Sequence, residues 1–119
     1  MAVRVLVVDD SRTFRAMLTD MLRGLGCVVV GEAADGEEAV ARFTELRPSL
    51  VLLDVEMPNA NGLSALMRIR AVDPRAVVIM CSVLESNSIL EACLVNGAAD
   101  YIRKDRMDEA PARLRRYLL

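Results

Sequence analysis

Three aspartates follow apolar segments in a way that could assemble one acidic site. Asp9 and Asp10 come directly after residues 3–8, and Asp54 comes directly after residues 50–53. Both segments are short and rich in branched aliphatic residues, which is typical of strands buried in a parallel sheet. Because the carboxyl ends of parallel strands share one edge, the three carboxylates are expected to meet there. Two carboxylates about 4 Å apart repel by roughly 4 kcal/mol at an effective dielectric of about 20, so the cluster requires a compensating cation or a shared proton.

Two further polar residues follow the other apolar segments. Ser82 comes directly after residues 76–81, and Lys104 comes shortly after the short segment 101–102. Together with the three acids, this hydroxyl and ammonium would suit a phosphoryl group carried on a carboxylate. Acids hold Mg²⁺, the metal offsets the phosphoryl charge, and the ammonium and the hydroxyl contact phosphoryl oxygens.

The segments that must position these residues alternate between strand and helix patterns. Strands are expected at residues 3–8, 27–30, 50–53, 76–81 and 101–102. Helices are expected at residues 14–25, 35–46, 61–72 and 87–95, and from residue 108 to the end. Five strand–helix repeats predict an α/β fold, with a five-stranded parallel sheet, helices on both faces and right-handed crossovers.

Turn and cap residues support several of these helix boundaries. Asp35 followed by Glu38 resembles a capping box, and Arg47 before Pro48 ends the same helix. The pair 61–62 opens the third helix, and the pair 96–97 supplies a left-handed cap after the fourth. Pro111 is compatible with the first turn of the last helix.

Composition narrows the function classes. The chain has 119 residues, 54% of them hydrophobic, which fits one compact domain. A net charge of −2 argues against general nucleic-acid binding, and the absence of His excludes His-based metal sites and general bases. The three cysteines, Cys27, Cys81 and Cys93, are expected to be core residues rather than a redox switch. With no signal peptide and no apolar run of membrane-spanning length, we expect a cytoplasmic protein without a membrane partner.

The chain resembles the receiver domains of bacterial two-component response regulators over essentially its whole length. The resemblance is carried by the acid pair before Ser11, the stretch 54–58 with Gly62, Ser82, and Lys104. It implies a flavodoxin-like (βα)5 fold in which residues 1–119 form one receiver domain. By analogy with a chemotaxis receiver, the strand order is expected to be 2-1-3-4-5.

The resemblance also implies roles for the acidic edge. Asp54 would accept a phosphoryl group from a histidine kinase as an acyl phosphate. Asp10, Asp54 and the backbone carbonyl of Glu56 would bind Mg²⁺ directly, and Asp9 would hold the metal through water. Lys104 would pair with the phosphoryl group. The domain would catalyse only its own phosphorylation and dephosphorylation and would otherwise not be an enzyme.

Two other residues are implied as a switch. Ser82 would donate a hydrogen bond to the phosphoryl group, and Tyr101 would then turn inward. The surface of the fourth helix, the fifth strand and the fifth helix would change shape and bind a protein effector, in chemotaxis-type or related signalling.

The sequence departs from the family at Asp105, where a proline usually follows the lysine. We expect a trans bond there, because a non-proline cis bond costs about 3 kcal/mol, and Asp105 could compete for the Lys104 ammonium. Glu56 lies close to the path of a hydrolysing water and could repel or orient it. Simpler interpretations stay open: helix capping for Asp9 and Asp10, and a turn or cap role for Ser82.

Other interpretations apply to the remaining site residues and to the whole chain. Lys104 could be a solvated loop residue, and Tyr101 an ordinary edge-strand aromatic. A Mg²⁺-dependent phosphatase is a rival, although that class carries D-x-D after its first strand. An unphosphorylated scaffold with this fold is another rival. Residues 54–58 and 80–84 are similar to the receiver half of chemotaxis methylesterases, so the chain could also be a fragment of such a regulator.

Overall fold

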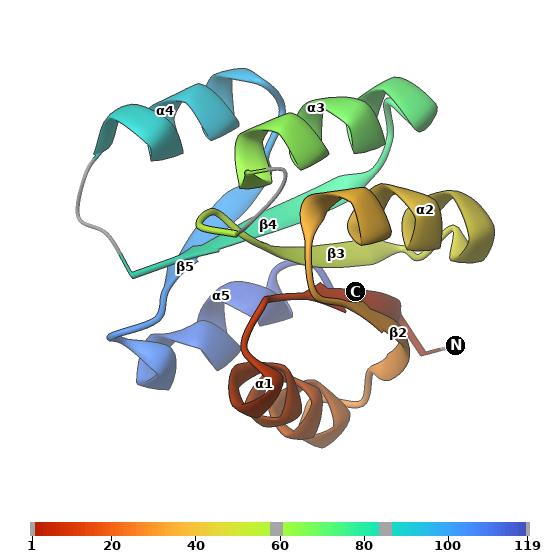
Figure 1. Ribbon diagram of the computed structural model, residues 1–119. Coiled ribbons are helices and arrows are strands. Elements are labelled where there is room, and N and C mark those ends of the chain that lie inside the picture. The colour runs from red at the N-terminus through yellow and green to blue at the C-terminus, as the bar shows by residue number, and fades with distance from the viewer. Residues whose placement is uncertain (1, 58–60, 84–86, 119) are drawn as a thin grey trace.

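The computed structural model describes residues 2–57, 61–83 and 87–118, and Figure 1 shows one parallel sheet with helices on both faces. The strands in this part of the chain are β1 (Arg4–Val8), β2 (Val28–Ala33), β3 (Leu50–Asp54), β4 (Val77–Ser82) and β5 (Asp100–Arg103). The helices are α1 (Arg12–Gly24), α2 (Gly36–Leu46), α3 (Gly62–Val72), α4 (Asn87–Val95), the 3-10 turn η1 (Met107–Glu109) and α5 (Ala110–Arg115). The hydrogen-bonded order β2-β1-β3-β4-β5 confirms the predicted topology.

Two apolar layers hold the sheet between its helices. Helices α2, α3 and α4 cover one face, and α1 and α5 cover the other (Figure 1). The first layer buries Phe43 and Leu66 against the sheet, and the second buries Leu18 and Leu114. Each such side chain stabilises the fold by about 1.5–3 kcal/mol when fully buried, so the strands offer a rigid base for the residues at their ends.

Most helix boundaries agree with the cap residues in the sequence. The Asp35 carboxylate accepts a hydrogen bond from the Glu38 N–H at 2.8 Å, and the Asn61 side chain accepts one from the Ser64 N–H at 2.8 Å. Arg47 ends α2 with a φ of 47°, and Gly97 follows α4 with a φ of 102°. These conformations satisfy the polar groups that helix ends leave unpaired.

Two predicted boundaries were wrong by more than two residues, and the other differences are of one or two residues. The second strand begins at Val28 and continues to Ala33, beyond residue 30, because Gly31, Glu32 and Ala33 pair with β1 after a register shift. The last helix begins as the 3-10 turn η1 and ends at Arg115 rather than at the chain end. Every helix in the described ranges is too short or too polar to span a lipid bilayer.

Strand register brings the predicted site residues to one edge. Val8 in β1 pairs with Leu53 in β3, so the residues that follow them, Asp9 and Asp54, are neighbours across the two strands. Asp54 itself pairs with Cys81 in β4, a residue that is 1% exposed. Beyond β5, the Lys104 N–H donates to the Ser82 carbonyl at 2.9 Å, which fixes the start of the next loop.

Candidate functional site

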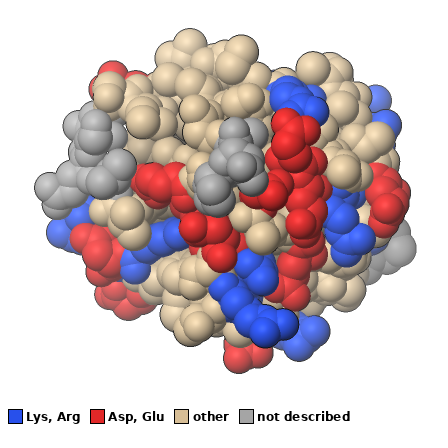
Figure 2. All heavy atoms as spheres, in the orientation of Figure 1, with Lys and Arg blue, Asp and Glu red and all other residues tan. Residues whose placement is uncertain are grey.

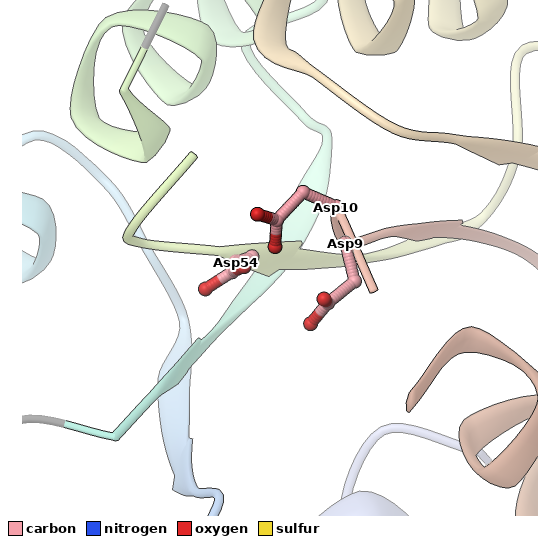
Figure 3. A group of neighbouring side chains, drawn as sticks. All are labelled: Asp9, Asp10 and Asp54. Atoms are coloured by element: carbon pink, nitrogen blue, oxygen red, sulfur yellow. The ribbon is translucent and has the colours of Figure 1, made fainter. Parts of the chain in front are cut away.

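The three aspartates gather where β1 and β3 end (Figure 3). One carboxylate oxygen from each of Asp9, Asp10 and Asp54 lies within 4.8 Å of the other two. Asp9 and Asp54 are buried, at 0% and 1% exposed, whereas Asp10 is exposed to solvent. The predicted acidic cluster is therefore present, with two members withdrawn from water and one at the surface.

Lys104 is the cation that compensates two of these acids. Its Nζ lies 2.6 Å from Asp9 Oδ2 and 3.2 Å from Asp54 Oδ2. The same nitrogen lies 4.5 Å from the centroid of the Phe14 ring, a distance at which a ring face attracts a cation. Burial disfavours the charge on Lys104, but its hydrogen bond to Asp9 and the charges of Asp54 and Asp9 outweigh burial and raise the pKa of the ammonium. Lys104 is thus part of the site rather than a solvated loop residue.

Asp54 has a strongly perturbed carboxyl. Burial raises the pKa of Asp54 to about 7; Lys104 opposes this rise, and the negative charge of Asp9 adds to it. The Glu56 N–H also donates to Asp54 Oδ1 at 3.1 Å and lowers the pKa slightly. Perturbed pKa values of this kind concentrate at functional sites. Burying an ionisable group costs stability, so such groups are found mainly where a function needs them.

Asp9 is held in place by hydrogen bonds to its side chain and to its backbone carbonyl. Its Oδ1 accepts from the Ser11 N–H at 2.9 Å, and its carbonyl accepts from Arg15 Nη1 at 2.7 Å. Ser11 supplies the N-cap of α1, where its hydroxyl accepts from the Phe14 N–H at 3.2 Å. Since Ser11 caps the helix, the two aspartates are not required for that purpose.

The Ser82 hydroxyl donates to Glu56 Oε1 at 2.8 Å. Ser82 is the last residue of β4 and is 1% exposed, so it lies at the buried edge with Asp54 rather than in a solvated turn. The edge therefore combines a buried carboxylate, an ammonium and a hydroxyl within one small region. A cluster of carboxylate oxygens is the donor set that a hard divalent cation such as Mg²⁺ requires, so the acids fit such an ion.

Comparison with known proteins supports one family. The response regulator receiver domain family matches residues 5–115. The chain is a response regulator receiver domain. The chemotaxis protein CheY of Thermotoga maritima is 40% identical over 104 residues, covering 87% of this chain and 87% of that protein. The CheY in a CheX–CheY–BeF3–Mg²⁺ complex from Borrelia burgdorferi is 33% identical, with a TM-score of 0.89 over 98% of this chain and 90% of that one.

A longer relative carries a similar receiver. A protein-glutamate methylesterase/protein-glutamine glutaminase of Bacillus licheniformis is 44% identical over 104 residues. The match covers 86% of this receiver but 29% of that protein. The resemblance to methylesterase receivers seen in the sequence is therefore also found by comparison.

Asp105, which could have competed with the acids for Lys104, has another partner in the structure. Asp105 instead forms a two-point ion pair with Arg103, in which Nε donates to Oδ1 at 3.0 Å and Nη2 to Oδ2 at 2.7 Å. These hydrogen bonds lower the pKa of Asp105 and keep it ionised. The peptide bond between Lys104 and Asp105 is trans, as predicted.

Tyr101 is half-buried on β5 and packs against the apolar layer under α2, α3 and α4. The Arg113 guanidinium of α5 lies 5.0 Å from the centroid of its ring. Arg113 Nη1 also donates to Asp100 Oδ1 at 2.8 Å, and the Tyr117 hydroxyl donates to Asp100 Oδ2 at 3.1 Å. Arg113 therefore joins the predicted switch residue to α5.

Gly62 allows α3 to start against the backbone of the site. A Cβ at this position would collide with the Asp54 carbonyl and lie 2.7 Å from Val55 Cα. The Gly62 N–H donates to the Val55 carbonyl at 2.9 Å, so the close approach is also hydrogen-bonded. Pro58 and Leu84 of the predicted motifs lie outside the described residues.

Sequence reasoning missed three contributors to the site. Phe14, Arg103 and Arg113 were given no role at the site from the sequence: Phe14 lies in the predicted helix 14–25, and the two arginines lie near the C-terminus. Their positions along the chain indicate a helix face and a solvated charge. The contacts with Lys104, Asp105 and Tyr101 depend on side-chain directions across elements, for which the sequence carries no local signal.

Proposed function

We propose that this receiver accepts a phosphoryl group on Asp54 from the phosphohistidine of a histidine kinase. The proposal rests on one arrangement above all: a buried carboxylate held between the ammonium of Lys104 and a cluster of acids able to bind a cation. In this account residues 1–119 act as one receiver unit. The reaction is the domain's own phosphorylation and later hydrolysis of the acyl phosphate.

In the transfer step, an Asp54 carboxylate oxygen attacks phosphorus. An O–P bond forms, the P–N bond to the donor imidazole breaks, and the imidazole leaves with the electron pair and takes up a proton. Lys104 stands beside the Asp54 oxygen at 3.2 Å and offsets the negative charge of the arriving group. Because the ammonium is already oriented and partly desolvated, little reorganisation is required at the moment of transfer.

Asp10, Asp54 and the Glu56 backbone carbonyl would bind Mg²⁺ directly, and Asp9 would act through water. When bound, Mg²⁺ supplies positive charge that screens the phosphoryl oxygens from the carboxylates. The exposed position of Asp10 gives an ion access to the cluster from solvent.

The output of the switch is proposed to be a change in binding of a protein effector at α4, β5 and α5. Ser82 and Tyr101 would carry the change from Asp54 to this surface. Helix α4 exposes the apolar residues Ile89, Leu94 and Val95 there, which a protein partner could cover. Figure 2 shows acidic side chains across the middle of this view and a largely uncharged surface above them, over α3 and α4.

A second candidate is the receiver part of a longer methylesterase-like regulator, favoured by the 44% identity to such a protein. Both candidates share the phosphoryl chemistry and differ in whether a catalytic domain is joined to the receiver. An unphosphorylated scaffold is the third candidate. The cytoplasmic location and the absence of nucleic-acid binding remain predictions.

Labelling by a small phosphodonor tests the proposal. We expect acetyl phosphate with Mg²⁺ to add one phosphoryl mass to the parent protein, with EDTA abolishing the reaction. Asp54→Asn should abolish labelling, whereas Asp20→Asn, which removes an exposed acid of α1, should leave it unchanged. Equal labelling of Asp54→Asn and the parent would contradict the assignment, and no labelling of the parent would favour the scaffold.

A further inference from the structure

Glu56 connects Asp54, the proposed phosphorylation site, to Ser82, one of the proposed switch residues. Its backbone N–H donates to Asp54 Oδ1 at 3.1 Å, and its side-chain Oε1 accepts the Ser82 hydroxyl proton at 2.8 Å. Glu56 lies just after β3 and Ser82 ends β4, so the side-chain bond crosses between neighbouring strands at the site. Movement of Ser82 toward Asp54 therefore requires a change in the Glu56 side chain.

The second oxygen of this carboxylate is in an unusual environment. Glu56 Oε2 is buried and has no hydrogen-bond partner among the described residues. A carboxylate oxygen buried without a hydrogen-bond partner is costly, and the hydrogen bond from Ser82 to the other oxygen is strengthened when its acceptor is charged. The carboxylate is thus held in place chiefly by the partner on its other oxygen, in a region that already contains Asp54.

We propose that the Glu56 side chain is a latch that holds the Ser82 hydroxyl in the unphosphorylated position and is expelled by the charge of a phosphoryl group on Asp54. The inference rests on the proposed function and adds a residue to it. Ser82 has a single hydroxyl proton, so it cannot donate to Glu56 and to a phosphoryl oxygen with the same proton. Phosphorylation would exchange one anionic acceptor for another.

Repulsion between the phosphoryl group on Asp54 and the Glu56 carboxylate would release Glu56 from Ser82. An acyl phosphate carries more negative charge than the carboxylate that it replaces, and it extends beyond the Asp54 oxygens into the site. Like charges repel strongly where water is largely excluded, and Glu56 already has one oxygen without compensation. Glu56 therefore leaves toward solvent, and the Ser82 hydroxyl can then donate to the phosphoryl group.

A double-mutant cycle measures the latch directly. The probe is beryllofluoride at saturating Mg²⁺, a mimic of the phosphoryl group, and the readout is its apparent dissociation constant, followed by NMR or tyrosine fluorescence. If the Glu56–Ser82 hydrogen bond is present in the free protein and absent in the beryllofluoride-bound protein, the effects of Glu56→Ala and Ser82→Ala on the dissociation constant will not be additive. We expect a coupling of about tenfold, the size of one charge-assisted hydrogen bond.

Matched variants separate the latch from simpler effects. Ser82→Thr keeps the hydroxyl, so Glu56→Ala should change the dissociation constant of the probe as much in the Ser82→Thr background as in the parent. Glu45→Ala removes an exposed acid of α2 and should show no coupling to Ser82→Ala. Glu56→Gln keeps an acceptor without the charge, so we expect tighter binding of the probe than in the parent and a coupling below that of Glu56→Ala.

The possible failures are distinguishable. The latch alone would be overturned if the probe binds normally and depends on Asp54, but the coupling between Glu56→Ala and Ser82→Ala is less than twofold. Binding that survives Asp54→Asn, or its absence in the parent, would overturn the receiver chemistry and the latch together. If Glu56→Ala fails to fold, Glu56→Gln supplies the same cycle, and less than twofold tightening by that variant would also count against the latch.

Discussion

Arg103 and Asp105 form a two-point ion pair across the residue that separates them, Lys104. The Asp105 carboxylate is paired with Arg103, while the Lys104 ammonium contacts Asp9 and Asp54. A residue that departs from the family pattern is thus accommodated by its neighbour. The aspartate at this position does not reduce the positive charge available to the site.

Removal of Arg103 should disturb the site through Asp105. In Arg103→Ala the freed carboxylate can approach Lys104, so we expect the rate of Asp54 labelling by acetyl phosphate to fall by about two- to fivefold. The double variant Arg103→Ala/Asp105→Ala removes the competitor and should recover the parent rate. An unchanged rate in the single variant, or no recovery in the double variant, would argue against this account.

Phe14 should act on Lys104 through its ring. Phe14→Leu keeps an apolar side chain but removes the ring face, so the pKa of Lys104 should fall, and Asp54 labelling should slow by about two- to fivefold. The pKa is measurable by NMR of the lysine side-chain nitrogen. Phe43→Leu removes an aromatic ring from the opposite layer and is the control. Identical Lys104 pKa values in both variants would contradict the contact.

The Asp54 carboxyl should make stability depend on pH. Its pKa is about 7 in the folded protein and returns to its ordinary value of 3.8 on unfolding. Between these values the folded state binds more protons than the unfolded state, so the Asp54 contribution to stability decreases as pH rises from about 4 to 7.

Asp54→Asn should remove this dependence. We expect the variant to be more stable than the parent by about 1–3 kcal/mol at pH 8, with the difference shrinking toward pH 4. Urea unfolding at several pH values in EDTA measures it, with Asp20→Asn as the control. A difference that stays constant across this range, or that grows toward low pH, would contradict the raised pKa.

Gly62→Ala should be destabilising because the added methyl group meets backbone atoms of Asp54 and Val55, which cannot rotate away. We expect a loss of about 2–4 kcal/mol in the free energy of unfolding. Gly24→Ala is the matched control, since a Cβ there would meet no atom within 4 Å apart from its chain neighbours and its own helix backbone, and it should change stability by less than about 1 kcal/mol. Equal effects of the two substitutions in urea unfolding would be inconsistent with the close approach.

The strand ends were predictable because each apolar segment stops at a polar residue. Asp9, Asp54 and Ser82 follow their segments directly, and a parallel sheet then brings them to one edge. Strand order came from analogy with a family, since apolar patterns do not distinguish one neighbour from another. The extension of β2 to Ala33 could not be predicted from its apolar pattern, because it depends on backbone pairing after a register shift.

Side-chain partnerships were the least predictable part of the site. Asp105 and Glu56 were both recognised as unusual, but their partners, Arg103 and Ser82, were not foreseen. Each partnership depends on one rotamer among several that the local sequence allows. Charge and position in the sequence therefore identified the unusual residues, whereas the partner of each side chain could be assigned only from the structure.

Cys81 in β4 pairs with Asp54 in β3, so a thiol lies next to the acidic edge of the sheet. Burial raises the pKa of Cys81 to about 12, and the thiolate is the form that reacts with alkylating reagents. Cys81 should consequently resist alkylation until β4 separates from its neighbours. The rate at which Cys81 is alkylated then measures how often β4 separates from its neighbours, and a ligand at the acidic edge should slow it.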